Sequence, residues 1–101
     1  MEILKGILSE SKNYYLDAEK KIGKKLLSLS KGSVKKRRIG VRDYYYLQYR
    51  QGKKIIQRYL GRSKPENLVK EIEKRSLLKR ALKKVREALK IIRRAEGRVH
   101  D

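Results

Sequence analysis

Residues 33–62 read SVKKRRIGVRDYYYLQYRQGKKIIQRYLGR, and this stretch decides the fold. β-Branched and aromatic residues dominate it, and glycines at positions 40, 52 and 61 divide it into short runs. Runs of this composition, separated by glycine, are typical of strands joined by tight turns. We therefore predict a three-stranded antiparallel β-meander, with strands over about residues 34–39, 43–50 and 53–60.

The second connection sets the register of this meander. If Gln51 and Gly52 form a two-residue turn, three cross-strand pairs follow: Leu47 with Ile56, Tyr45 with Arg58, and Tyr44 with Tyr59. Side chains alternate between the faces of a strand, so one of two sets must pack on the rest of the protein. These sets are Tyr45, Leu47 and Tyr49 on one face, and Tyr44, Tyr46 and Gln48 on the other.

The segments on both sides of the meander have a helical period. Over residues 2–30, apolar and small residues recur every three or four positions, and Gly32 is available as a left-handed cap. This stripe comprises Leu4, Leu8, Ser11, Tyr15, Ala18, Ile22, Leu26 and Leu29, widened by Ile3, Ile7, Tyr14 and Leu27. Ser63 and Glu66 form a capping box for a second helix over residues 63–97, which Gly97 ends. Its stripe is close to heptad spacing and comprises Leu68, Ile72, Leu78, Leu82, Val85, Leu89 and Ile92.

These elements predict an α+β fold in a single domain, residues 1–101. Two helices of similar length, joined by a small sheet, pair most simply as an antiparallel coiled-coil hairpin with the sheet at its head. Because a bare pair of helices buries little surface, we expect a homodimer with a four-helix arrangement.

Charge is the strongest functional signal in the sequence. The chain carries 30 Lys and Arg against 11 Asp and Glu, a formal net charge of +19. Between residues 31 and 64, twelve Lys and Arg face a single acidic residue, Asp43. Self-repulsion on this scale costs stability unless a polyanion relieves it, and nucleic acid is the commonest such partner. Five of the seven Tyr lie in the same third of the chain, where their rings can stack on bases.

We therefore predict a non-enzymatic nucleic-acid-binding protein, with duplex DNA favoured over RNA. We expect eight cations of the basic β-module, residues 33–62, to neutralise phosphates: Lys35, Lys36, Arg37, Arg38, Arg42, Lys53, Lys54 and Arg62. Arg50, Arg58, Tyr44 and Tyr46 are predicted to make closer contacts to bases or sugars. With about eight phosphates neutralised, log affinity should fall against log salt with a slope of about −7.

Several other classes of protein are disfavoured. The chain has no Cys, which excludes a disulfide scaffold, a thiolate zinc site and a Cys nucleophile. Its one His, His100, stands next to the end of the sequence, and no paired carboxylates or glycine-rich phosphate loop occur. We expect no catalytic residue, no metal site and no cofactor. No apolar run is long enough to span a bilayer, so we expect a cytoplasmic, nucleoid-associated protein without a membrane partner.

The stretch from Gly32 to Gly61 resembles small basic prokaryotic proteins of unassigned function that share a GS…YYYLxYRxGKxxxxYLG motif. The matching residues are Gly32, Ser33, Tyr44 to Leu47, Tyr49, Arg50, Gly52, Lys53, Arg58, Tyr59, Leu60 and Gly61. The motif is similar to that of the arm-type DNA-binding domains of tyrosine recombinases, and to N-terminal segments of some transposases. The resemblance implies a DNA-binding sheet and an association with mobile elements or toxin–antitoxin operons. Val41 and Arg42 replace the small turn residues of that pattern.

Two alternatives stay open. The protein can be the basic partner of an acidic protein such as a toxin or a transposition enzyme, in which case the helices carry the contact. A basic stripe on the second helix would serve that role or a secondary phosphate track: Lys79, Lys83, Arg86, Lys90 and Arg93. It can also bind RNA, because a basic composition fits RNA equally well, and exposed Tyr side chains would favour single strands.

Overall fold

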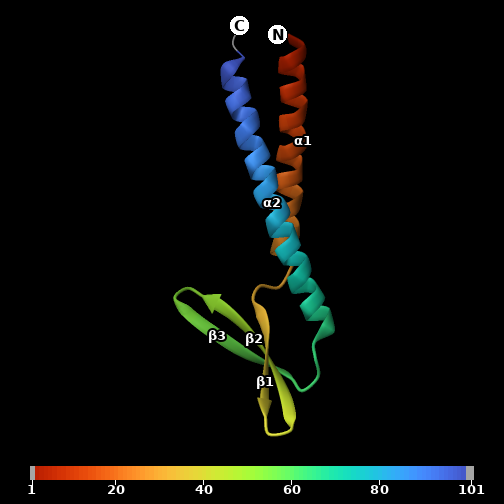
Figure 1. The fold of residues 1–101 in the computed structure, drawn as a ribbon, viewed down its shortest axis with the longest axis vertical. Helices are drawn as coiled ribbons and strands as arrows, with labels where there is room; N and C mark the ends of the chain where they lie inside the picture. The colour runs from red at the N-terminus through yellow and green to blue at the C-terminus, as the bar shows by residue number, and fades with distance from the viewer. Residues whose placement is uncertain (1, 100–101) are drawn as a thin grey trace. The chain divides into compact units, whose positions relative to one another are not determined.

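A computed structural model describes residues 2–99 and has one helix on each side of a three-stranded sheet (Figure 1). In chain order the elements are α1 (Glu2–Leu27), β1 (Ser33–Ile39), β2 (Arg42–Gln51), β3 (Lys54–Gly61) and α2 (Glu66–Arg98). The strands are antiparallel in the order β1-β2-β3. The predicted α+β class, the meander and the two long helices are confirmed.

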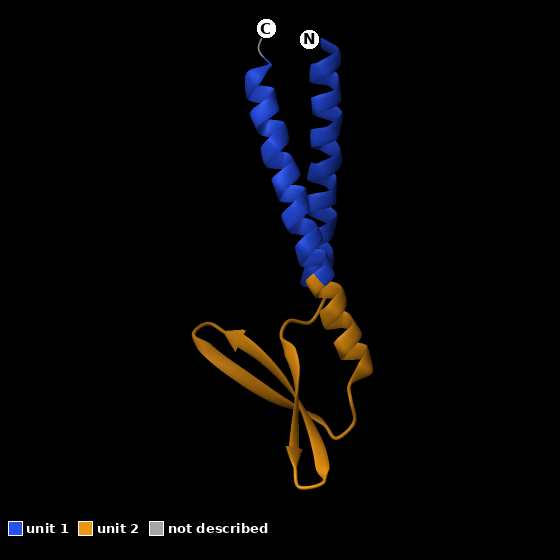
Figure 2. Cartoon of the chain, in the orientation of Figure 1, with its two compact units in different colours: residues 1–28, 77–101 blue, residues 29–76 orange. Residues whose placement is uncertain are grey.

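The chain divides into two compact units (Figure 2). Residues 29–76 form one unit, which holds the sheet and the first turns of α2. Residues 1–28 and 77–101 form the other, in which α1 packs beside the remaining length of α2 in the antiparallel sense. Each unit is described separately below, since the sheet and the helical pair bury different side chains.

The β2–β3 register differs from the predicted one by two residues. Leu47 pairs with Arg58 instead of Ile56, because the turn consists of Gly52 and Lys53 rather than Gln51 and Gly52. Gly52 has φ of +62° and occupies the first central position of this turn. In the predicted turn, Gln51 would need that left-handed backbone, which a residue with a side chain rarely adopts. A shift of two residues keeps each side chain on its face, so the predicted alternation survives.

A β-bulge interrupts the same strand pair farther along. Tyr46 pairs with Tyr59, whereas the adjacent Tyr45 pairs with Gly61, which leaves Leu60 as the extra residue. The bulge was not predicted, and Tyr44 pairs with Arg37 of β1 rather than with Tyr59. Bulges increase the local twist of a strand pair.

One face of the sheet, which we call the inner face, carries the core of its unit. Leu47 is 8% exposed and is the only buried residue of the sheet. Val34 is its partner on β1, and Tyr45 and Tyr49 flank it on the same face of β2. Val69 and Ile72 of α2 line a pocket together with Val34 and Tyr45, so the first turns of this helix lie over the inner face. The opposite face, the outer face, carries Tyr44, Tyr46 and Gln48.

Gly32 has a different role from the predicted helix cap. Helix α1 ends at Leu27, five residues earlier, where Ser28 donates both its N–H and its hydroxyl to the carbonyl of Lys25. Gly32 has φ of +108°, and a Cβ there would lie 2.5 Å from the carbonyl oxygen of Gln48. Glycine is therefore required because the chain passes close to β2 as it enters β1.

The limits of α2 are also corrected. This helix begins at Glu66 instead of Ser63, since the carbonyl of Pro65 accepts its first hydrogen bond, from the N–H of Val69. Gly97 does not end the helix, which continues to Arg98.

In the helical unit, the predicted stripes of α1 and α2 face each other along one narrow line of contact, which we call the seam. Leu89 is 1% exposed and Ile92 is also buried, whereas no residue of α1 is fully buried. Two ion pairs fix the antiparallel alignment: Lys12 with Glu96 at 3.2 Å, and Arg86 with Glu19 at 3.3 Å. The residues that were expected to widen the α1 stripe stay exposed, because one partner helix covers only the seam. They are Ile3, Ile7, Tyr14 and Leu27, and Leu4 at the N-terminal end is exposed as well.

Candidate nucleic-acid interface

An aromatic cluster occupies the outer face of the sheet. The ring of Tyr59 lies 5.5 Å from that of Tyr46 and 6.3 Å from that of Tyr44, between ring centroids, with tilted planes in both pairs. The guanidinium of Arg37 stacks on Tyr46, 5.3 Å from the ring centroid. Tyr59 is 53% exposed, so the cluster presents a ring to solvent. Such a surface can receive the flat face of a base or the edge of a sugar.

A chain of side-chain hydrogen bonds crosses the same face from β1 to β3 and back to β2. Arg37 donates from Nη2 to Oε1 of Gln57 at 2.9 Å, and Gln57 donates from Nε2 to Oε1 of Gln48 at 3.1 Å. Because Tyr46 and Gln57 both contact its guanidinium, Arg37 is held flat against the sheet. The three side chains of this hydrogen-bonded series, Arg37, Gln57 and Gln48, are all accessible to solvent.

The predicted contact residues do not share one surface. The KKRR run of β1 alternates, so that Lys35 and Arg37 lie on the outer face while Lys36 and Arg38 lie on the inner face. Six of the twelve predicted residues are on the outer face: Lys35, Arg37, Arg42, Tyr44, Tyr46 and Arg50. Lys36, Arg38, Lys54 and Arg58 are on the inner face, Lys53 is in the β2–β3 turn, and Arg62 follows β3. Arg50 and Arg58, predicted to act together, are therefore on opposite faces.

The one acidic residue of the sheet lies on the inner face. Asp43 forms an ion pair with Lys36 at 3.5 Å through Oδ2, while its Oδ1 is buried and has no hydrogen-bond partner among the described residues. The outer face thus carries cations and no acidic side chain. An anion that approaches the outer face meets no carboxylate on the strands.

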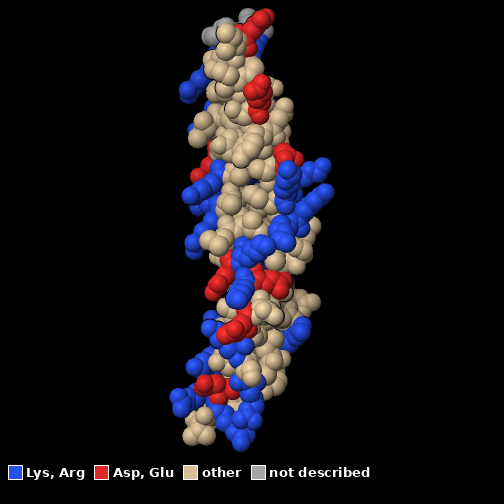
Figure 3. Space-filling view, turned by 90° about the vertical axis from the view of Figure 1, so that its right-hand side faces the viewer, with Lys and Arg blue, Asp and Glu red and all other residues tan. Residues whose placement is uncertain are grey.

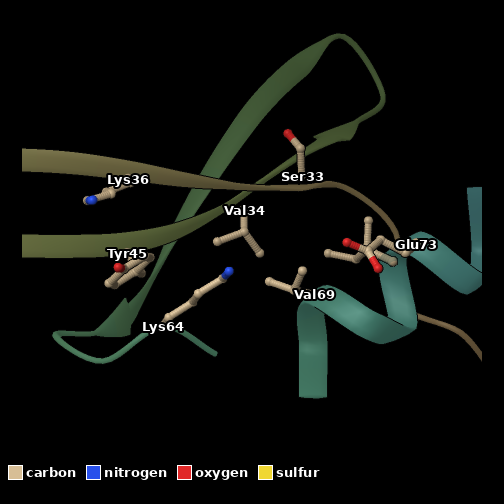
Figure 4. Close-up of a pocket in the computed structure, with 8 residues that line it drawn as sticks. Ser33, Val34, Lys36, Tyr45, Lys64, Val69 and Glu73 are labelled. Carbon is tan, nitrogen blue, oxygen red and sulfur yellow. The ribbon is translucent and has the colours of Figure 1, made fainter. Parts of the chain in front are cut away.

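A pocket of about 400 Å³ lies on the inner side of the sheet (Figure 4). Val34, Tyr45, Val69 and Ile72 supply most of its apolar lining. Lys64, from the connection between β3 and α2, extends across it toward Val34 (Figure 4). The remaining lining residues are Ser33, Lys36 and Glu73. Nearby, Glu71 accepts hydrogen bonds from the N–H and the hydroxyl of Ser30, at 2.7 and 3.0 Å. The pocket belongs to the support of the sheet, away from the aromatic cluster.

The basic stripe predicted on α2 is exposed along the helical unit. Lys79, Lys83, Arg86 and Lys90 line a second, shallow pocket with Leu26, Leu82 and Glu87. Lys and Arg outnumber Asp and Glu in each unit, and Figure 3, which shows one side of the molecule, has Asp and Glu scattered among the Lys and Arg. The net positive charge is therefore a property of both units, whereas the tyrosine cluster belongs to the sheet alone.

Two absences concern residues 2–99. Neither helix there has a stretch long and apolar enough to cross a bilayer. No group of three His, Asp or Glu side chains in that range comes together as a metal site. His100 lies outside the described residues.

Three residues of the aromatic cluster and its hydrogen-bonded series were missing from the predicted contact set: Gln48, Gln57 and Tyr59. Tyr59 is the cross-strand partner of Tyr46, and it has the same parity on β3 as Gln57, the partner of Gln48, so alternation places it on this face. The two glutamines carry no charge, and a search guided by charge passes over them. Their pairing across the strands depends on the register, which was predicted incorrectly.

Comparisons with known proteins identify a family for this chain, but they find no relative of known activity. No curated protein matches the chain, and no solved structure matches it. A family model matches residues 13–70, more than half of the chain, from within α1 through the sheet to the first turns of α2. The chain therefore belongs to the family described as a domain of unknown function (DUF6788).

Proposed function

We propose that this protein is a non-enzymatic nucleic-acid-binding protein that contacts duplex DNA through the outer face of its sheet. The observation that carries the proposal is the stack of Arg37 on Tyr46, beside Tyr59 and Tyr44, on a face without a carboxylate. Arginine and tyrosine side chains bind phosphates, sugars and base edges, and their fixed positions lower the entropy lost on binding.

Electrostatics supply most of the affinity in this proposal. Lys35, Arg37, Arg42 and Arg50 share the outer face with the rings, and Lys53 extends the set into the β2–β3 turn. Arg62, which follows β3, brings the number of groups available for phosphates to six. Association with DNA would also relieve the self-repulsion of a chain with net charge +19. In a prokaryotic cell such a protein would associate with the nucleoid in the cytoplasm.

A titration at several salt concentrations tests the proposal. Labelled duplex DNA, single-stranded DNA and RNA are titrated with the full chain and followed by fluorescence anisotropy. We expect duplex binding whose log affinity falls against log salt with a slope between about −4 and −6, for five or six phosphates. The proposal fails if none of the three nucleic acids binds at moderate salt.

RNA or another single strand is the second candidate, and the exposed ring of Tyr59 favours it. Bases of a single strand are free to stack on this ring and on Tyr46, whereas those of a duplex are already stacked. Tighter binding of single strands than of duplex in the same titration would select this candidate. A basic partner for an acidic protein is the third, with the exposed cations of α2 as its contact. A complex that survives 0.5 M salt without measurable DNA affinity would select it.

A further inference from the structure

The two edges of the sheet differ in how open they are to a further strand. Because the strand order is β1-β2-β3, β1 and β3 each pair on one side only within the described part of the chain. The unpaired N–H and C=O groups of an edge are a template for another strand, and a row of cations discourages such pairing. β1 carries the KKRR run, so a copy of β1 placed beside it would set cations opposite cations. β3 has eight residues, of which only Lys54 and Arg58 are charged.

The free edge of β3 is clear of the helix that covers the sheet. The pocket beneath the first turns of α2 is lined from the sheet by residues of β1 and β2 and by none of β3. In Figure 2 the β2–β3 turn lies on the side of the sheet away from these turns of α2. Ile55 near the start of β3 is 61% exposed, and Tyr59 near its end is 53% exposed. Another strand can therefore approach β3 along this stretch.

The backbone groups of three residues of β3 point away from β2. Gln51 and Lys54 pair directly across the two-residue turn, so the N–H and C=O of Lys54 are directed toward β2. These groups alternate in direction along a strand, so Ile55, Gln57 and Tyr59 direct theirs to the free edge. The side chains of the same three residues lie on the outer face. The bulge of β3 begins only beyond Tyr59, so it leaves this alternation intact.

We propose that β3 pairs antiparallel with β3 of a second copy of this chain, so that the two sheets form one of six strands. The two-fold axis passes beside Gln57, which lies opposite Gln57 of the second copy. Ile55 of each copy then lies opposite Tyr59 of the other, and such pairs of β-branched and aromatic side chains stabilise antiparallel sheets. Directly opposite residues share a face, so the outer faces of the two copies become one surface. This dimer uses the edge of β3, whereas the four-helix arrangement expected from the sequence uses the helices.

The residues of β3 are complementary to themselves in this register and not in the neighbouring ones. Arg58 lies opposite Ile56 of the other copy, and Lys54 lies at the end of the pairing, level with Leu60. Sliding one strand by two residues keeps the backbone groups facing each other. It places Arg58 opposite Lys54 in one direction and opposite Arg58 in the other, and like charges directly opposite are destabilising. In the proposed register the two Arg58 side chains are diagonal neighbours.

The oligomeric state of the full chain tests this proposal. At about 0.3 M salt, which screens the repulsion between two cationic chains, sedimentation equilibrium should give twice the 12.0 kDa mass by about 200 μM. A monomer up to that concentration would overturn the proposal. Ile55→Lys places a cation on the free edge and should raise the dimer dissociation constant at least about tenfold.

The matched control is Ile39→Lys at the end of β1. Ile39 also lies on the outer face and is also 61% exposed, and the charge change is the same. This variant should change the dissociation constant less than about threefold, because it leaves β3 unaltered. Equal weakening by the two variants would contradict the assignment of β3 as the interface.

A disulfide cross-link tests the register itself, because the chain has no Cys of its own. Directly opposite residues of a hydrogen-bonded antiparallel pair have Cα atoms about 5.5 Å apart, a separation that a disulfide spans. Gln57→Cys should therefore give a covalent dimer on air oxidation. Ile55→Cys is the control on the same face of β3, and its two thiols would be four residues apart along the pair, about 13 Å, too far to bridge.

The two Cys variants separate a specific pairing from random collision. We expect Gln57→Cys to cross-link at least about fivefold faster than Ile55→Cys. Equal cross-linking of both variants, or none in either, would overturn the proposed pairing. Neither the cross-link nor the sedimentation measurement involves nucleic acid, so the dimer and the proposed function can fail independently.

Discussion

The two faces of the β-sheet come from one alternating sequence, yet they have opposite roles. On the inner face, Leu47 is buried opposite Val34, and the first turns of α2 lie over this side. On the outer face, Tyr46 sits among Tyr59 and Arg37, with solvent access. Both faces carry tyrosines and cations, so composition alone does not separate them. What separates them is the single buried leucine, which fixes the core side and leaves the even-numbered tyrosines of β2 for contact.

The largest effect is expected from the centre of the inner face. Leu47→Ala should destabilise the protein by about 2–4 kcal/mol, because it truncates the one buried side chain of the sheet. Thermal unfolding followed by circular dichroism measures this loss. Tyr59→Ala on the outer face is the control and should cost less than about 1 kcal/mol. A comparable loss in both variants would show that the faces do not differ as described.

Gly32 tests the close approach behind the inner face. Gly32→Ala should cost about 2–3 kcal/mol, since its Cβ would meet the Gln48 carbonyl at 2.5 Å on a backbone with φ of +108°. Gly40→Ala is the matched control, with φ of +65° and no atom near the new Cβ, and should cost about 1 kcal/mol. Chemical denaturation of both variants gives the difference. Equal costs would mean that backbone conformation, and not contact with β2, explains the glycine.

The aromatic cluster should matter for binding more than for folding. Tyr59→Leu removes the exposed ring but keeps an apolar side chain, and should weaken binding of single strands about 5- to 50-fold. Duplex binding should weaken less, because duplex bases are already stacked. Anisotropy titrations of the two nucleic acids at one salt concentration provide the comparison. Unchanged affinity for both would remove Tyr59 from the contact surface.

The smallest effect is expected from a conservative change at Arg37. Arg37→Lys keeps the charge but loses the planar stack on Tyr46 and the bond to Gln57. The salt slope for duplex DNA should therefore stay within about 0.5 of the wild-type value, while the affinity falls about two- to fivefold. A change in the slope as large as that of Arg37→Ala would mean that the position of the guanidinium, as well as its charge, determines the phosphate contact.

Much of the architecture was predictable, because the periodicity of apolar residues and the positions of the glycines between strands depend directly on local structure. The meander, both long helices and the separation of Leu47 from Tyr46 follow from alternation and heptad spacing. The register was not predictable from the Gln51–Gly52 sequence alone. It depends on which turn position adopts the left-handed backbone, and here Gly52 takes the first central position.

The candidate interface was predictable only in part. The charge pattern located the basic β-module in the sequence. It could not show which face of the sheet makes the contact, because the KKRR run places two cations on each face. The choice of the buried face required knowing where α2 packs, which is a tertiary property. For the same reason the exposure of Ile7 and Tyr14 was missed. A stripe on one helix does not reveal how much of it a single partner helix covers.

The most direct test of the central claim compares two double variants of β1. Lys35→Ala with Arg37→Ala removes two cations from the outer face, and Lys36→Ala with Arg38→Ala removes two from the inner face of the same strand. The charge change is identical, so only the face differs. We predict that the outer pair flattens the salt slope for duplex DNA by about 1.5 to 2 and the inner pair by less than about 0.5. Equal slopes for the two variants, or a larger effect of the inner pair, would contradict the account.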